Sequence, residues 1–206
     1  TPLHAGYILE DNLPFILRLL PAAILILAVG LVDDLYSLRP WQKLIGQTAI
    51  ATLAFSLGLR VTTLAGYEIG GLTSFAVTVF WLLLCTNAFN LIDGMDGLAA
   101  GVALFATLTI LVMSLLQDDV PLALATAPLA GALLGFLRYN VPPASIFLGD
   151  SGSLLVGFLL GSYAIVWSQK CATLLGLTAP VMAFAVPFLD VALAVARRFL
   201  RGQPIF

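Results

Sequence analysis

The stretch Asn87–Gly101, NAFNLIDGMDGLAAG, decides how this chain is organised. It joins two apolar runs, 72–92 and 98–116, each long enough to cross the roughly 30 Å of hydrocarbon in a bilayer. Its polar side chains recur at every third position and are Asn87, Asn90, Asp93 and Asp96. Carboxylates at a membrane boundary are costly unless they are paired or bound to a metal, so they are candidates for function. The stretch predicts a membrane protein with a polar site at one membrane surface.

The composition supports this interpretation. Of the 206 residues, 61% are hydrophobic and 10% are charged, whereas about a quarter are charged in soluble domains. The apolar runs are interpreted as helices, because an open sheet cannot satisfy its backbone hydrogen bonds in lipid. We predict an all-α, polytopic transmembrane helix bundle of about seven helices. The expected spans are 13–32, 41–59, 72–92, 98–116, 121–138, 152–169 and 174–196. The alternating segment 61–71 between two spans predicts a short extracytoplasmic hairpin.

The charged residues indicate an orientation. Basic residues gather in one set of connections and are Arg39, Lys43, Arg138, Arg197, Arg198 and Arg201. The positive-inside rule puts that set in the cytoplasm. The same side then holds five aspartates, which are Asp33, Asp34, Asp93, Asp96 and Asp150. Residue 1, Glu68 and Asp118 fall outside. We predict a multi-pass protein of the inner or plasma membrane with an active site that faces the cytoplasm.

Small residues at helix-packing intervals occur as the pairs Gly97 and Gly101, Gly131 and Gly135, and Gly157 and Gly161. Spacing of the GxxxG kind lets two helix backbones approach closely. We predict that these pairs build a compact bundle and carry no chemistry.

Two further segments complete the polar side. In GLVDDLYSLRPWQKLIGQ (30–47), two adjacent aspartates end a helix and Lys43 follows. In SIFLGDSGSLLVG (145–157), Asp150 lies between glycines where a helix begins, and the free N–H groups of that helix start suit an anion. One cytoplasmic aspartate is often solvated and idle, but five in three glycine-rich clusters favour function. Because Mg²⁺ binds through one or two carboxylates plus substrate phosphates, the pattern predicts a metal-dependent site for a phosphorylated substrate. The spacing does not name that substrate.

The segments VDDLYSLRPWQKLIGQ, NAFNLIDGMDGLAAG and IFLGDSGSLLVGFLLG resemble the polyprenyl-phosphate N-acetylhexosamine-1-phosphate transferases, and VPFLDVALAVARRFLRGQPIF resembles a late helix and basic loop of that family. The match is closest to the WecA/TagO branch, with MraY a more distant relative. The resemblance implies transfer of N-acetylglucosamine-1-phosphate from UDP-N-acetylglucosamine to undecaprenyl phosphate, release of UMP, and initiation of a cell-envelope polysaccharide. The implied partners are a UDP-sugar, a polyprenyl phosphate and the membrane. No nucleic acid is expected, and a homodimer is left open.

The resemblance also implies roles for individual residues. Asp33, Asp34 and Asp150 are the implied catalytic residues, and Asp150 and Asp34 would hold Mg²⁺, for which Mn²⁺ is an alternative. The aspartate pair has been assigned metal, lipid-phosphate and general-base roles in the family. We favour orientation and metal-linked roles, because a phosphate acceptor is already ionised at neutral pH. The implied substrate-binding residues are Asn87, Asn90, Asp93, Asp96, Gly97 and Lys43.

Members of that family typically have ten or eleven helices. We therefore expect residues 1–206 to be a single integral membrane domain and a fragment of a larger transferase, apparently truncated at both ends. The family's histidine-rich motif follows a segment like RGQPIF, where this chain stops, and the single histidine, His4, is interpreted as incidental. TPLHAGY resembles the start of an earlier helix on the cytoplasmic side, whereas the charges put residue 1 outside. We therefore expect residues 1–32 to form a shortened or re-entrant passage.

Three alternatives remain. A CDP-alcohol phosphotransferase is suggested by a DG-x-x-A element in DGMDGLAAG, but that family continues with an arginine that this chain lacks, and no acidic residue follows until Asp118. A cation-coupled membrane carrier would use intramembrane carboxylates and broken helices, but here the carboxylates cluster at one face. An inactive or truncated relative of the transferases is the third alternative.

Overall fold

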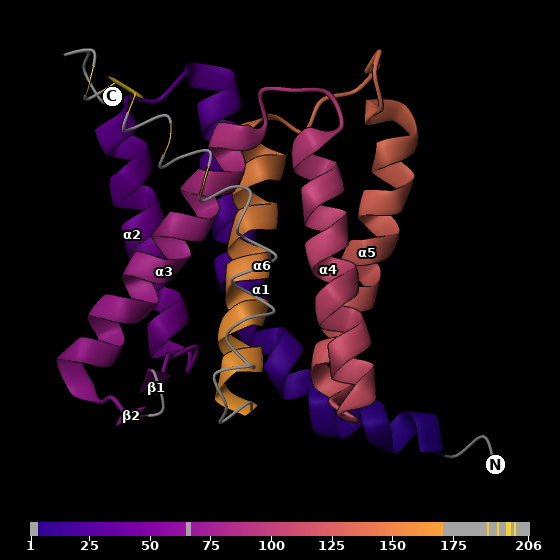
Figure 1. Ribbon diagram of the computed structural model, residues 1–206. Helices are drawn as coiled ribbons and strands as arrows, with labels where there is room; N and C mark the ends of the chain where they lie inside the picture. The colour runs from indigo at the N-terminus through magenta and orange to yellow at the C-terminus, as the bar shows by residue number, and fades with distance from the viewer. Residues whose placement is uncertain are drawn as a thin grey trace.

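The structure, a computed structural model, describes residues 4–64 and 67–170 and the single positions 189, 193, 197, 198 and 200. Within 4–170, side chains are described between residues 17 and 168. This part of the chain forms an all-α bundle of six helices with one short hairpin, as predicted (Figure 1). The elements are α1 (His4–Tyr36), α2 (Pro40–Ser56), β1 (Thr63–Leu64), β2 (Tyr67–Glu68), α3 (Gly71–Ile92), α4 (Leu98–Leu116), α5 (Val120–Asn140) and α6 (Gly149–Lys170).

Five of the described helices are long and apolar enough to cross a membrane: α1 over Leu17–Tyr36, α3, α4, α5, and α6 over Gly149–Ser168. The chain is therefore a multi-pass membrane protein. Helix α2 has 17 residues, which at 1.5 Å per residue make it about 26 Å long. The predicted seventh span, 174–196, lies outside the described residues apart from two single positions.

Helix α1 differs from its prediction. The expected passage was shortened or re-entrant, but the structure has one continuous helix of 33 residues. Its first residue lies at the end of the bundle opposite to the last turns of α1, which carry Asp33 and Asp34, as the charge distribution predicted. The N-terminal part of α1 runs at an angle to the rest (Figure 1). Pro21 lies within this helix. Proline removes one backbone hydrogen bond and is a usual cause of helix bends, so a bent helix can include it without ending.

Successive helices run in opposite directions, so the connections alternate between the two ends of the bundle (Figure 1). The α1–α2, α3–α4 and α5–α6 connections share one end, which we call the polar end. The hairpin and the α4–α5 connection lie at the other. In the predicted hairpin, Thr63 lies opposite Glu68 in an antiparallel pair. It is tied to α3 through Val61, whose amide donates to the Thr78 hydroxyl (2.9 Å) and whose carbonyl accepts from Ser74 (2.6 Å).

Helix α6 runs through the middle of the bundle (Figure 1). Its glycines let it contact α3 closely: a Cβ added to Gly157 would lie 2.8 Å from the Cys85 carbonyl oxygen, and one added to Gly161 would lie 3.0 Å from the Cys85 Cβ. The predicted close packing is confirmed there. For the other pairs it stays a prediction, because no described residue lies within 4 Å of a Cβ added to Gly101, Gly131 or Gly135. Gly97 instead adopts a left-handed turn conformation, with φ +75°.

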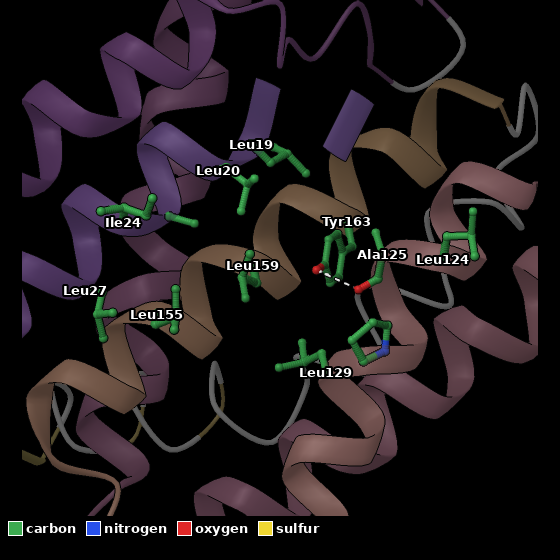
Figure 2. A pocket seen from close by; sticks show the side chains of 12 residues that line it. Leu19, Leu20, Ile24, Leu27, Leu124, Ala125, Leu129, Leu155, Leu159 and Tyr163 are labelled. Atoms are coloured by element: carbon green, nitrogen blue, oxygen red, sulfur yellow. Dashed lines mark hydrogen bonds between the residues drawn. The ribbon is translucent and has the colours of Figure 1, made fainter. Parts of the chain in front are cut away.

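A cavity of about 440 Å³ lies between α1, α5 and α6 (Figure 2). Its lining is apolar, and the Tyr163 hydroxyl donates to the Ala125 carbonyl at 3.0 Å. Helix α5 contains Pro128, which lacks the N–H that would donate to the Leu124 carbonyl four residues before it. Among the described residues, no charged side chain lines the cavity.

Candidate active site

The end of α1 presents Asp33, which is 7% exposed. One carboxylate oxygen, Oδ1, accepts a hydrogen bond from the backbone N–H of Leu38 (2.7 Å) in the α1–α2 connection. The other, Oδ2, forms an ion pair with the Lys43 ammonium group (2.7 Å). Asp33 therefore stabilises the α1–α2 connection and contacts α2.

Lys43 lies in the first turn of α2, which begins at Pro40. Its ammonium group contacts three oxygens: Asp33 Oδ2 at 2.7 Å, Asn90 Oδ1 at 2.8 Å and Asp150 Oδ1 at 3.1 Å. An ammonium group has three donors, so these contacts can use all of them. Lys43 thereby links residues of α1, α3 and α6, which are distant in sequence.

Asn90 lies near the end of α3 and completes this network. Its amide oxygen accepts from Lys43, and its amide nitrogen donates to Asp150 Oδ1 and to the hydroxyl of Ser153 (2.9 Å). Ser153 is fully buried. Ser153 is not among the site residues that the sequence predicted. Its three-residue distance from Asp150, one helical turn on the same face, was the available signal.

Asp34 faces a different partner from Asp33. Its two oxygens accept the backbone N–H groups of Asp150 (2.7 Å) and Ser151 (2.9 Å), at the start of α6. The sequence predicted that the free N–H groups at this helix start would suit an anion. In the structure, two of them donate to a carboxylate of the protein itself. A Cβ added to Gly149 would lie 3.1 Å from both Asp34 oxygens. Glycine at that position lets the carboxylate approach the helix.

Asn87 lies one turn before Asn90 in α3 and does not join the network. Its amide nitrogen donates to Gln47 Oε1 (2.7 Å) and to the Leu83 carbonyl (2.8 Å), and Gln47 Nε2 donates back to Asn87 Oδ1 (3.4 Å). Gln47 is 2% exposed. This amide pair joins α2 to α3. Gln47 was missed, although it stands four residues after Lys43 and so on the same helix face.

Asp96 and Gly97 lie in the α3–α4 connection and bind the neighbouring α5–α6 connection. Asp96 Oδ2 accepts from the backbone N–H of Ala144 (3.0 Å), and the Gly97 N–H donates to Asn140 Oδ1 (3.0 Å). Asn140 is buried and also donates to the Ile146 carbonyl (2.9 Å). It is a further residue that sequence reasoning missed. These contacts hold two connections together beside the network.

Asp93 is half-buried, and its carboxylate makes no hydrogen bond or ion pair within the described residues. Burial, together with the negative charges of Asp150 and Asp34, raises the pKa of Asp93 to about 6. Three carboxylates thus repel one another at the polar end, and Lys43 contacts only one of them. A bound divalent cation would relieve that repulsion.

These residues fit a magnesium ion. Asp150 and Asp93 would supply carboxylate oxygens, the ligands that Mg²⁺ prefers, and water and substrate phosphates would complete its shell. Within the described residues no three acidic, histidine or cysteine side chains come close enough to form a complete protein cage. Both Asp34 oxygens already accept backbone hydrogen bonds, and the predicted role of Asp34 as a ligand stays a prediction.

The chain was compared with known proteins. Residues 16–168 match the model of a family described as glycosyl transferase family 4. Over 189 residues the chain is 36% identical to the "Probable undecaprenyl-phosphate N-acetylglucosaminyl 1-phosphate transferase" of Bacillus subtilis (strain 168), covering 89% of this chain and 52% of the relative. It is 35% identical to the "Decaprenyl-phosphate N-acetylglucosaminephosphotransferase" of Mycolicibacterium smegmatis, covering 98% and 55%.

A third relative is the "Phospho-N-acetylmuramoyl-pentapeptide-transferase" of Desulforamulus reducens, which is 34% identical over 67% of this chain and 47% of the relative. The chain spans about half the length of the curated relatives it matches. The resemblance carried by the three motifs is thereby confirmed at the level of the family. With a family model that covers most of its membrane helices and its polar end, the chain belongs to glycosyl transferase family 4.

Proposed function

We propose that this protein transfers N-acetylglucosamine-1-phosphate from UDP-N-acetylglucosamine to a polyprenyl phosphate and releases UMP. The observation that carries the proposal is the network of Asp33, Lys43, Asn90 and Asp150 at one end of a membrane bundle. Three segments distant in sequence converge there, and they are the three motifs of the family resemblance. The positive-inside rule puts this end in the cytoplasm, since Arg39, Lys43 and Arg138 lie at it.

The proposed chemistry is a direct displacement. An oxygen of the lipid phosphate bonds to the β-phosphorus of the UDP-sugar, and the bond from that phosphorus to the oxygen bridging to the α-phosphate breaks. UMP leaves with the bridging oxygen. A phosphate monoester has a second pKa near 6, so it is largely ionised at neutral pH and needs no strong base. Positioning and offset of charge are then the main contributions of the protein.

The described residues support such positioning. Asp150 and Asp93 would hold Mg²⁺, which when bound would offset negative charge on the diphosphate. Lys43 forms ion pairs with both Asp33 and Asp150, and it would supply a positive charge beside the reacting phosphates. Asp33 is engaged by Lys43 and by the Leu38 N–H, so its contacts suit orientation better than proton abstraction. Asp96 and Gly97 would border the nucleotide-sugar from the neighbouring connection.

Two features bear on the substrate and on the alternatives. Relatives at 35–36% identity are named for N-acetylglucosamine and for undecaprenyl or decaprenyl phosphate, and we propose the same sugar here. The product would then begin a cell-envelope polysaccharide.

A cation-coupled carrier would hold its carboxylates near the middle of the membrane. Here they lie at helix ends, which favours the transferase.

The test is transfer by the purified protein, expressed from its complete gene, in detergent. Radiolabelled UDP-N-acetylglucosamine, undecaprenyl phosphate and Mg²⁺ should give a lipid-linked product and UMP in equal amounts. Asp150→Asn should abolish product, whereas Asp118→Asn, an exposed residue at the opposite end of the bundle, should leave it unchanged. Formation of product only from a UDP-muramyl-pentapeptide would refute the proposed sugar. An Asp150→Asn variant with full activity and unchanged Mg²⁺ dependence would refute the proposed site.

A further inference from the structure

Helix α1 meets the first turn of α6 with almost no space between the two backbones. A Cβ added to Gly30 would lie 2.4 Å from the Cα of Ser151 and 2.6 Å from the carbonyl oxygen of Asp150. Real Cβ atoms do not approach backbone atoms so closely, so any larger residue at position 30 must separate the two helices. Gly30 lies one turn before Asp34 on the same face of α1.

Asp34 continues this contact with hydrogen bonds. Its carboxylate accepts the backbone N–H groups of Asp150 and Ser151, one on each oxygen. The first N–H groups of a helix have no partner within the helix. A capping side chain usually comes from the residue just before the helix, but here that residue is Leu148, which has no polar group. Asp34 supplies the cap from another helix, and its negative charge favours the positive end of the α6 dipole.

The two adjacent aspartates therefore bind different partners. Successive residues on a helix point about 100° apart, so neighbouring side chains reach different partners. Asp33 turns to Lys43 on α2, and Asp34 turns to the start of α6. Both contacts converge on Asp150, whose carboxylate lies 3.1 Å from Lys43 and whose backbone N–H is held by Asp34.

We propose that Asp34 is a positioning residue that, together with Gly30, docks α1 onto α6 and sets the place of Asp150, and that it does not itself hold the cation. This inference rests on the proposed function for the role of Asp150. A cation bound to Asp34 would compete with two backbone N–H groups that have no other partner within the described part of the chain. Loss of the cap loosens the first turn of α6, which carries Asp150, while Ser153, one turn further, stays buried.

The first test is hydrogen–deuterium exchange of the purified full-length protein in detergent with EDTA, so that neither metal nor substrate contributes. In Asp34→Asn, peptides that include the N–H groups of Asp150 and Ser151 should exchange about fivefold faster, as expected for loss of a helix cap. Gly30→Ala should give the same local increase. Gly131→Ala is the matched control and should not, because its added methyl group would meet no described residue within 4 Å.

The second test is direct binding of Mn²⁺, followed by electron paramagnetic resonance. Asp34→Asn should bind Mn²⁺ within about threefold of the unaltered protein, whereas Asp150→Asn should weaken binding at least about tenfold, a difference of 1.4 kcal/mol. Unchanged exchange at the start of α6, or a loss of Mn²⁺ binding in Asp34→Asn equal to that in Asp150→Asn, overturns the proposal. Neither measurement requires turnover. Failure to form a lipid-linked product would therefore refute the proposed function without deciding the role of Asp34.

Discussion

Replacing Lys43 with methionine should destabilise the protein measurably. The change removes the positive charge that contacts Asp33, Asn90 and Asp150, and it keeps a side chain of similar length. It leaves Asp33 ionised and nearly buried without its ion-pair partner, and it leaves the amide oxygen of Asn90 without its donor. Both losses act in the folded state, since the unfolded chain solvates these groups.

The magnitude follows from the exposure of the partners. Removing one member of a buried ion pair costs about 3–5 kcal/mol, whereas an exposed pair is worth about 1 kcal/mol or less. The side chains of Lys43 and Asp33 are 14% and 7% exposed, and that of Asp150 is 33% exposed, so solvent screens part of the effect. We expect a loss of about 2–3 kcal/mol. For a chain of this size that corresponds to a melting temperature lower by about 4–12 °C.

The assay is thermal unfolding in detergent, followed by tryptophan fluorescence, with a double-mutant cycle. In the Lys43→Met background, Asp33→Asn removes the unpaired charge and should recover at least half of the lost stability. Transfer activity should fall at least about a hundredfold in Lys43→Met, about 2.7 kcal/mol in the barrier. Activity should not return in the double variant, because the positive charge beside the phosphates is still missing.

One result would refute this reasoning. If Lys43→Met melted at the temperature of the unaltered protein, and Asp33→Asn had the same effect with or without Lys43, the ion pair would contribute nothing to the fold. Lys43→Arg tests the geometry separately. A planar guanidinium cannot place its donors as a compact ammonium group does, so this variant should keep stability better than activity.

Three further predictions concern other residues. Because the pKa of Asp93 is raised to about 6, its ionised form destabilises the fold above that pH, and protonation relieves this cost as the pH falls. Protonation also removes the negative charge that would attract a cation. Mn²⁺ affinity should therefore decrease as the pH is lowered through 6, and Asp93→Asn should remove that pH dependence. Gly157→Ala should cost about 1–3 kcal/mol in thermal unfolding, since its methyl group would lie 2.8 Å from a backbone oxygen of α3, whereas Gly135→Ala should be nearly neutral. Gln47→Leu should cost about 1–3 kcal/mol by leaving the Asn87 amide without its partner, and adding Asn87→Leu should restore much of that loss, again by thermal unfolding.

Much of the architecture could be predicted because lipid imposes simple rules. The span 98–116 was predicted with the bounds that α4 has, and the spans for α3 and α5 differ from the observed helices by one or two residues at an end. Helices that alternate in direction bring every second connection to the same end. That rule alone put the three motifs together. The predicted length of α1 was wrong, because prolines and a charge interrupt its apolar pattern without ending the helix.

The site was predicted less completely. Asp33, Lys43, Asn90 and Asp150 do converge in one network, but Asn87 turns to Gln47 instead. The four polar residues of the opening stretch look equivalent at three-residue spacing. Asn87 and Asn90 lie on α3, where a turn of about 100° per residue makes side chains three apart diverge by about 60°. Asp93 and Asp96 follow the end of α3, so the connection and not the helix sets their directions. Which neighbour each one meets depends on the packing of α2 and α6 against α3.

The sequence by itself determined that the chain crosses a membrane several times, which end carries its polar groups, and to which family its motifs point, because hydropathy, charge bias and motif identity are properties of the chain read in order. Only the tertiary structure decided the direction of each polar side chain. The contact of Gly30 with Ser151, the cap that Asp34 gives to α6 and the shared ammonium group of Lys43 all join residues far apart in sequence. Such contacts depend on helix rotation and close approach, which no local pattern encodes.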